Sequence, residues 1–198
     1  PMRAAPILAE LNRSDATRHL DLTLLVADAH RERGDHARAV SLYREVLTRR
    51  SRGAQADRTR LGLAAAQEDT GDLGAAIGTL RTAQLEHRTG IGYADALAAE
   101  RRLSQQLDQP RAPFTPTQYR TMTRRLRTYS RYGEAAALID EWREVQPDAG
   151  ERLDVELIGV LYDSRSNEAA VERCGAFAAR YPSSPLLGNV KLTEFRLA

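Results

Sequence analysis

Apolar residues recur three and four positions apart along most of this chain, whereas windows of strict apolar–polar alternation are rare. Residues 20–29 show the pattern, with leucine, valine and alanine returning at helical spacing. Ala, Leu, Arg and Glu are abundant, and all four are good helix formers. The pattern therefore predicts an all-α protein.

The apolar pattern repeats around two Gly-Asp pairs, Gly34-Asp35 and Gly71-Asp72. Defined positions before and after each glycine carry small or large apolar residues: Val26, Ala27, Ala39, Tyr43 and Val46, then Leu63, Ala64, Ala76, Leu80 and Ala83. Glycine at the anchor predicts that one helix ends there in a left-handed turn. The alanine five residues later lets the second helix cross close to the first, so each repeat predicts a helical hairpin.

Two weaker copies of the pattern follow, anchored at Ser130 and Arg165 in place of glycine. Their packing positions are Ala135, Ile139 and Trp142, then Ala170, Cys174 and Phe177, and Pro147 and Pro182 close the two copies. The four anchors are 37, 59 and 35 residues apart, and one hairpin of a stacked array needs roughly 34 residues. The long middle gap therefore predicts an extra helix at residues 93–107. Its apolar stripe is Tyr93, Ala96, Leu97, Leu103 and Leu107.

A proline-rich connector, residues 109–114, precedes a well-marked helix start. Thr115 is the expected N-cap, Pro116 the first helical residue and Gln118 the capping-box partner. We expect N-terminal hairpins over 1–88, the extra helix and connector over 89–115, and C-terminal hairpins over 116–198, in one continuous stack. The apolar segment PILAEL near the start is typical of the second half of a hairpin, so we expect a fragment of a longer protein.

These hairpins resemble the tetratricopeptide repeat (TPR) family over residues 20–88 and 116–182. The resemblance implies a right-handed α-solenoid of stacked antiparallel helical hairpins, in which neighbouring hairpins cover each other's apolar faces. It also implies a superhelical, protein-binding scaffold rather than a particular activity. In this family the first helix of each hairpin lines a concave groove.

The groove positions that the resemblance implies are strongly basic in the third hairpin. Arg120, Arg124 and Arg127 stand at i, i+4 and i+7 and so share one helical face. An acidic peptide, a glycan carboxylate or a phosphate would oppose their charge. The alternative is a solvated face, or pairing with acidic residues of the neighbouring hairpin. The other predicted partner-binding residues are Arg31, Arg152 and Tyr162. Further groove positions are Asp21, Leu24, Asp28, Glu32, Arg58, Leu61, Ala65, Glu68, Asp69, Thr117, Thr128, Val155, Gly159 and Asp163.

The C-terminal half is also similar to the helical superhelix of bacterial soluble lytic transglycosylases. The similar segments are TPTQYRTMTRRL, RYGEAAALIDEW and AFAARYPSSPL. In those enzymes a separate lysozyme-like domain cleaves peptidoglycan with a Glu followed by Ser, and this chain contains no Glu-Ser dipeptide. The resemblance implies the non-catalytic part of such an enzyme, and the periplasm of the bacterial cell envelope as its location. The cytoplasm is the alternative, and the residues themselves leave the compartment unknown.

Charge and composition exclude several classes of protein. The chain has 198 residues, with 29 Lys+Arg against 27 Asp+Glu and a formal charge of +2. This balance disfavours a protein that binds duplex DNA through charge, so we expect no nucleic-acid partner. No apolar run approaches the length of a membrane span, so we expect no membrane insertion. One cysteine cannot form an internal disulfide or a multi-cysteine metal site.

Candidate catalytic chemistry is sparse. The histidines, His19, His30, His36 and His87, lack the spacing of a zinc-protease motif, and Cys174 occupies a packing position of the repeat. We expect no enzymatic activity, no cofactor, and no catalytic or metal-binding residue. The predicted function is a non-catalytic protein–protein interaction scaffold whose partner is a protein or peptide, either acidic or peptidoglycan-like. The alternatives are the superhelical domain of a lytic transglycosylase and a regulatory helical array of a transcription factor or secretion assembly.

Overall fold

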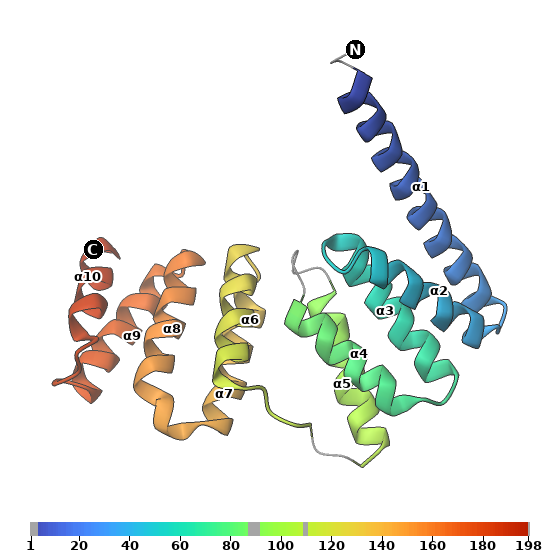
Figure 1. Ribbon diagram of the computed structural model, residues 1–198. Coiled ribbons are helices and arrows are strands. Elements are labelled where there is room, and N and C mark those ends of the chain that lie inside the picture. The colour runs from blue at the N-terminus through green and yellow to red at the C-terminus, as the bar shows by residue number, and fades with distance from the viewer. Residues whose placement is uncertain (1–3, 87–91, 109–110, 198) are drawn as a thin grey trace. The chain divides into compact units, whose positions relative to one another are not determined.

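The computed structural model describes residues 4–86, 92–108 and 111–197, with side chains from Arg18 onward. Within these residues the chain forms ten α-helices and no strand, which confirms the predicted all-α class (Figure 1). The helices are α1 (Ala4–Glu32), α2 (His36–Arg49), α3 (Ala54–Asp69), α4 (Leu73–Glu86), α5 (Tyr93–Gln106), α6 (Pro116–Thr128), α7 (Tyr132–Val145), α8 (Gly150–Asp163), α9 (Asn167–Arg180) and α10 (Leu187–Leu197), with a short 3₁₀ helix, η1 (Pro147–Ala149), before α8.

The helices pack in chain order within two compact units. Unit 1 is Pro1–Arg111 and unit 2 is Ala112–Ala198, so the boundary lies in the proline-rich segment. In unit 1 each helix from α1 to α5 packs against the next one, and α1 also contacts α3. In unit 2 the same holds from α6 to α10, and α8 also contacts α10. We call α1, α3, α5, α6, α8 and α10 the first helices, and α2, α4, α7 and α9 the second helices.

The four anchors of the sequence repeat are the turns between first and second helices. Gly34 and Gly71 have φ of 84° and 81°, and Ser130 and Arg165 adopt the same left-handed conformation with φ of 57° and 59°. At each anchor the next amide also bonds to the carbonyl five residues before it, for example Asp35 N to His30 O at 2.9 Å. This bond is characteristic of a Schellman turn, in which glycine is preferred but not required. The hairpins anchored at serine and arginine therefore keep the geometry of the glycine hairpins.

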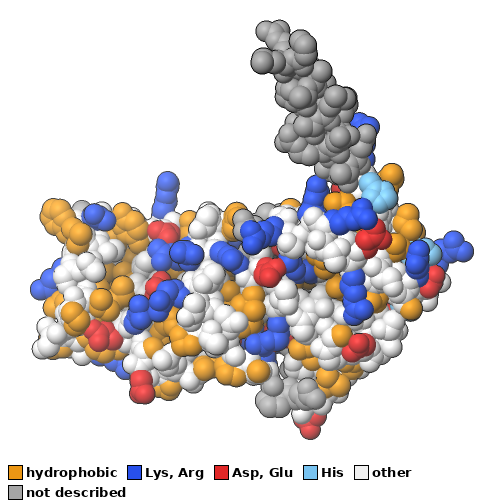
Figure 2. All heavy atoms as spheres, viewed as in Figure 1, with side chains coloured by type: hydrophobic (Ala, Val, Ile, Leu, Met, Phe, Trp, Pro, Cys, Tyr) orange, Lys and Arg blue, Asp and Glu red, His pale blue; other side chains and the backbone are white. Residues whose placement is uncertain are grey.

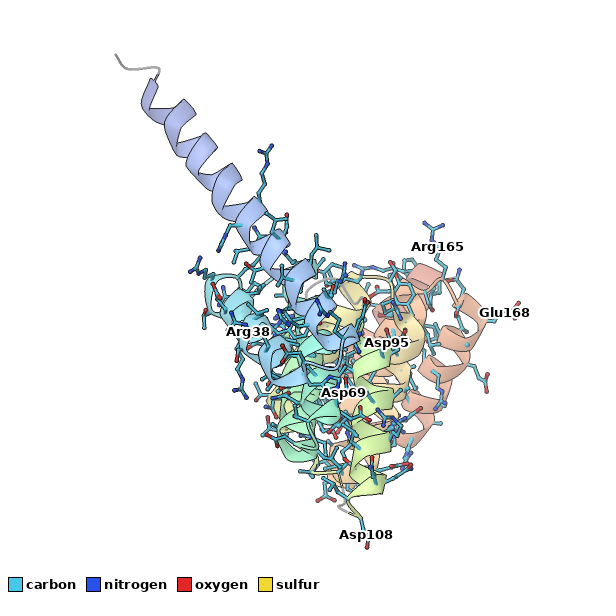
Figure 3. All side chains as sticks on the ribbon, turned by 90° about the vertical axis from the view of Figure 1, so that its right-hand side faces the viewer. Arg38, Asp69, Asp95, Asp108, Arg165 and Glu168 are labelled. Atoms are coloured by element: carbon cyan, nitrogen blue, oxygen red, sulfur yellow. The ribbon has the colours of Figure 1, made fainter. Side chains whose placement is uncertain are left out.

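A fifth left-handed residue, Asp108, follows α5 with φ of 51°. It stands 37 residues after Gly71, just as Gly71 stands 37 residues after Gly34. The expected extra helix, α5, therefore has the place of the first helix of a third repeat. Figure 3 shows Asp108 at the far end of α5 with its side chain directed away from the helices. The next helix, α6, begins at Pro116 and pairs with α7 instead, so the repeat loses its phase at the sequence boundary between the two units.

Alanine stands at the crossing of each hairpin, as the repeat predicts. Ala39, Ala76, Ala135 and Ala170 are all fully buried. A larger side chain at these positions would force the paired helices apart, since close helix packing leaves no void to receive it. The large packing residues, including Tyr43, Leu80, Ile139 and Phe177, are buried beside them.

The interior of unit 1 contains a buried ionic cluster at α5. Glu100 is 0% exposed and accepts bonds from Arg81 (2.7 Å), Arg111 (2.8 Å) and Gln84 (2.7 Å). Arg111 also donates to the Gln84 side-chain oxygen at 3.1 Å. A buried carboxylate is tolerated only when such donors satisfy it. The cluster holds α4, α5 and the start of the connector together.

The interior of unit 2 is aromatic instead. Tyr119 stacks on Trp142 with ring centroids 5.6 Å apart, and Phe114 meets Tyr119 edge to face at 5.7 Å. The predicted capping box begins α6, with both bonds between Thr115 and Gln118 present. Phe114 immediately precedes the N-cap, so the cap fixes the direction in which the chain enters the aromatic cluster.

One local prediction is wrong. PILAEL is not the second half of a separate hairpin, because α1 continues without a turn over 29 residues from Ala4 to Glu32. Between Pro6 and Gly34 the sequence contains no glycine or proline, so nothing interrupts the helix. Pro6 itself lies in the first turn, where proline is tolerated. Another residue named above, His87, lies outside the described residues.

Candidate functional site

The first helices of unit 1 are joined across one face by ion pairs. Arg58 on α3 donates to Asp28 on α1 at 2.8 Å, and Arg31 on α1 lies 3.9 Å from Asp69 on α3. We call this side of a unit, where its first helices meet, the first-helix face. Asp69, labelled in Figure 3, also lies 3.3 Å from the His36 ring. The predicted binding residue Arg31 is therefore engaged within the protein.

A further ion pair connects α3 to α5 on the same face. Arg102 donates two parallel bonds, of 2.6 and 2.7 Å, to the carboxylate of Glu68. These bonds lower the pKa of Glu68 below its usual range and raise the pKa of Arg102. Bidentate pairing of this kind is the strongest geometry available to arginine and a carboxylate.

A buried tyrosine of α2 bonds to one of the carboxylates of this face. Tyr43 on α2 is fully buried and donates a 2.6 Å bond to Asp28. Burial, together with the neighbouring carboxylate, raises the pKa of Tyr43 to about 12. The ring lies against Gly62 of α3, where an added Cβ would come within 2.8 Å of it. The Asp28 carboxylate thus accepts hydrogen bonds from both Tyr43 and Arg58, and the guanidinium of Arg58 compensates its charge.

Unit 1 also has a cavity of about 480 Å³ between α1 and α3. It is lined by Asp21, Leu24, Leu25, Ala54, Gln55 and Arg58. The polar side chains at its rim bond to one another or to the protein: Gln55 donates to Asp21, and Arg58 to Asp28. Of these residues, the groove positions named from the sequence include Asp21, Leu24 and Arg58. They omit the other three, which carry no local mark of a binding site.

In unit 2, one of the three predicted arginines is bound tightly to α8. Arg127 reaches Asp163 Oδ2 with Nε and Nη2, both at 2.8 Å, and Glu156 Oε2 with Nη1 at 3.5 Å. Its guanidinium lies directly over Gly159, where an added Cβ would come within 3.0 Å of Nη1 and Nη2. Two carboxylates and a glycine therefore hold Arg127 flat against α8.

The other two arginines are exposed. Arg120 and Arg124 form no ion pair with any carboxylate among the described residues, although Arg127 on the same stripe forms two. With Thr121, Arg127 and Glu156 they line a cavity of about 240 Å³. Figure 2 shows Lys and Arg side chains spread over the face of the chain that it presents. The stripe thus divides into one paired arginine and two unpaired ones.

A second cavity, of about 270 Å³, adjoins the first. Arg127 and Glu156 line both, and α8 and α10 supply the rest of the second: Val155, Ile158, Gly159, Asn189, Val190 and Thr193. The two cavities adjoin along α6, α8 and α10, and we call them together the unit 2 groove. The groove positions named from the sequence include Val155, Gly159 and Asp163 but not Glu156, which stands one helical turn before Gly159 on α8.

The remaining predicted residues lie outside these cavities. Arg152 is exposed in the first turn of α8, and Tyr162 is 38% exposed near the end of that helix. Arg31 belongs to unit 1, as described above. The structure therefore brings together Arg120, Arg124 and Arg127, and does not assemble all six predicted residues into one site.

Reactive groups are engaged in packing or in pairs. Cys174 is fully buried, and this burial raises the pKa of its thiol. His30 bonds to Asp35 at 2.9 Å beside the first turn. Among residues 4–86, 92–108 and 111–197, no group of three or more His, Cys, Asp or Glu side chains could hold a metal ion. Within the same residues, no helix is both long and apolar enough to cross a membrane.

No protein-family model matches this chain, and a search of curated proteins gave no match.

Proposed function

We propose that this chain is a non-catalytic scaffold for protein–protein interaction, built as a right-handed, TPR-like α-solenoid. In this proposal the first helices of each unit line the binding surface, and the unit 2 groove receives a segment of the partner protein. The repeat of hairpin turns at Gly34, Gly71, Ser130 and Arg165 supports the solenoid.

The observation that carries the proposal is the pair of adjoining cavities on α6, α8 and α10. Pockets for small molecules usually enclose about 300–1,000 Å³. Each cavity of the groove, at about 240 and 270 Å³, is smaller than that. A row of small cavities along one face suits successive side chains of an extended chain better than it suits one compact ligand.

A displayed library of random segments of about twelve residues, selected on the immobilised chain, tests the proposal. The first matched variant is the double substitution Thr121→Trp with Thr193→Trp, which places an indole in each cavity. The control is Thr82→Trp on α4. Thr82 is exposed and donates to the carbonyl four residues before it, as Thr121 and Thr193 do.

We expect enriched segments that lose about tenfold or more in affinity on the double variant, equivalent to about 1.4 kcal/mol. The same segments should bind the Thr82→Trp control as they bind the parent chain. Circular dichroism would verify that both variants remain helical. A library that yields no segment enriched over the bare support would contradict the proposal, as would enriched segments that bind the double variant at full strength.

A further inference from the structure

We infer that the partner segment of the unit 2 groove is extended and acidic, with carboxylates at alternate positions that pair with Arg120 and Arg124. Arg127 supports the groove and does not bind the partner. This inference rests on the proposed function, since it names the chemistry of the segment that the groove receives.

The unit 2 groove has a net positive charge. Arg127 is compensated by Asp163 and Glu156, so the positive charge that remains in the cavity belongs to Arg120 and Arg124. Both are exposed, and neither is paired within the described part of the chain. Like charges one turn apart on a helix repel each other, and an opposing anion relieves that repulsion. The groove therefore favours an anionic occupant.

The spacing of Arg120 and Arg124 matches the spacing of alternate residues in an extended chain. Residues four apart on a helix are separated by a rise of about 6 Å. In an extended chain, alternate residues point to the same side and lie about 6.6–6.8 Å apart. Two carboxylates at alternate positions of an extended segment thus match Arg120 and Arg124, each of which can bind a carboxylate through two parallel bonds.

The size of the cavity distinguishes an extended segment from a helical one. An acidic helix also repeats at about 6 Å, but with its side chains it is about 10–12 Å across. The cavity beside Arg120 and Arg124 is about 240 Å³, and the second cavity, of about 270 Å³, adjoins it at Arg127 and Glu156. Cavities of this size have room for single side chains of an extended segment and not for a helix.

The contacts of Arg127 with α8 show why it does not bind the partner. Nε and Nη2 contact Asp163, Nη1 contacts Glu156, and the plane of the guanidinium lies over Gly159. Glycine inside a helix costs roughly 1 kcal/mol relative to alanine. Here it makes the room that the guanidinium occupies between the two cavities. Arg127 is therefore a positioning residue that forms the wall shared by the two cavities.

The same displayed library tests the identity of the partner segment. The enriched segments should contain Asp or Glu at alternate positions, above their frequency in the unselected library. On the double variant Arg120→Glu with Arg124→Glu, the preference should reverse, with Lys or Arg enriched at the same spacing. The control is Arg44→Glu with Arg173→Glu, two exposed arginines on second helices, which changes net charge equally and should leave the acidic preference intact.

The outcomes separate this inference from the proposed function. Segments that need the open cavities but show no acidic preference would overturn the inference and leave the scaffold standing. An acidic preference that survives Arg120→Glu with Arg124→Glu would also overturn the inference. A library with no enriched segment would overturn both.

The role of Arg127 is tested with Gly159→Ala, whose methyl group would come within 3.0 Å of Nη1 and Nη2 and so push the guanidinium off its position over Gly159. We expect the affinity for a selected acidic segment to fall less than it does in Arg124→Gln, with thermal stability unchanged or raised. The control, Gly175→Ala on α9, has nothing within 4 Å of the added Cβ and should bind normally. Salt dependence supplies a second readout, because each lost ion pair lowers the slope of affinity against salt concentration. Arg124→Gln should reduce that slope and Gly159→Ala should keep it. An equal reduction by both would show that Arg127 binds the partner.

Discussion

The two units use charge and aromatic side chains in opposite ways. Unit 1 places a buried carboxylate in its interior and pairs the charges of its first-helix face with one another, as in Glu68 and Arg102. Unit 2 stacks aromatic rings in its interior and leaves two arginines of its face unpaired among the described residues. Charges that already hold helices together are not free for a partner. In the function proposed above, the partner therefore binds at the charges of the face that no neighbouring helix already pairs.

Trp142→Ala should have the largest effect, since it removes the centre of the unit 2 interior. Trp142 is buried and stacks on Tyr119. Truncation of a buried aromatic residue to alanine usually lowers the free energy of unfolding by about 3–5 kcal/mol. Urea denaturation followed by circular dichroism measures it, because Trp142 is the single tryptophan and its fluorescence is lost with it. Val145→Ala, at an exposed position of the same helix, should change stability little. A loss below about 1 kcal/mol for Trp142→Ala would refute the aromatic interior.

Glu100→Ala breaks the corresponding centre of unit 1. Arg81, Arg111 and Gln84 would lose their common acceptor while remaining largely buried. Removal of one partner of a buried ionic cluster costs about 3 kcal/mol or more. The same denaturation experiment measures the loss, with Gln105→Ala on the exposed side of α5 as the control. If Glu100→Ala and Gln105→Ala lowered the free energy of unfolding equally, the buried cluster would not be what stabilises this part of unit 1.

Features of these two units that depend on adjacent residues were predictable from the sequence, and features that depend on tertiary packing were not. The hairpin turns were predictable because each one is followed by apolar residues at the same distances, whether the turn residue is glycine or, as at Ser130 and Arg165, another residue. The capping box at Thr115 was predictable from four adjacent residues. Glu100 was not, because a glutamate inside an apolar stripe has no local sign of burial, and its donors come from α4 and the connector. Asp108 escaped notice as a repeat anchor because no second helix follows it.

The candidate site divides in the same way. The arginine stripe was visible, since i, i+4 and i+7 are local to one helix. Pairing with acidic residues of the neighbouring hairpin was one of the alternatives, and Arg127 confirms it. Which of the three arginines would pair was not predictable, because that depends on Glu156, Gly159 and Asp163, which lie about thirty residues further along the chain. Pairing between neighbouring first helices is set by tertiary packing, and a single helix carries no trace of it.

Tyr43→Phe sharpens the comparison at the unit 1 face. The variant loses the bond to Asp28, with an expected cost of about 1–2 kcal/mol. It should also change the alkaline behaviour. The folded-state pKa of Tyr43, about 12, lies above its ordinary value of 10.0, so its contribution is complete below pH 10 and is lost as pH rises towards 12. Chemical denaturation at several alkaline pH values should show a decline in the parent chain that is reduced in the variant. Equal declines in both would contradict this assignment.

Glu68→Gln should have the smallest effect. The pair with Arg102 is partly exposed to solvent, and exposed ion pairs contribute less than about 1 kcal/mol. Salt screens such pairs, so the difference between variant and parent should shrink as salt concentration rises. Thermal unfolding at low and high salt measures this. A difference that is large and independent of salt would mean that Glu68 supports unit 1 by some other contact.

The most direct test of the contrast between the two faces is a nuclear magnetic resonance titration of the arginine side chains. The probe is a peptide with both termini blocked and glutamate at alternate positions, so that only side-chain carboxylates can bind. We predict that the Nε–Hε signals of Arg120 and Arg124 shift as peptide is added, that Arg127 changes little, and that Arg58 and Arg102 of unit 1 keep their positions. Equal shifts at Arg58 and Arg102, or unmoved signals of Arg120 and Arg124, would contradict the account.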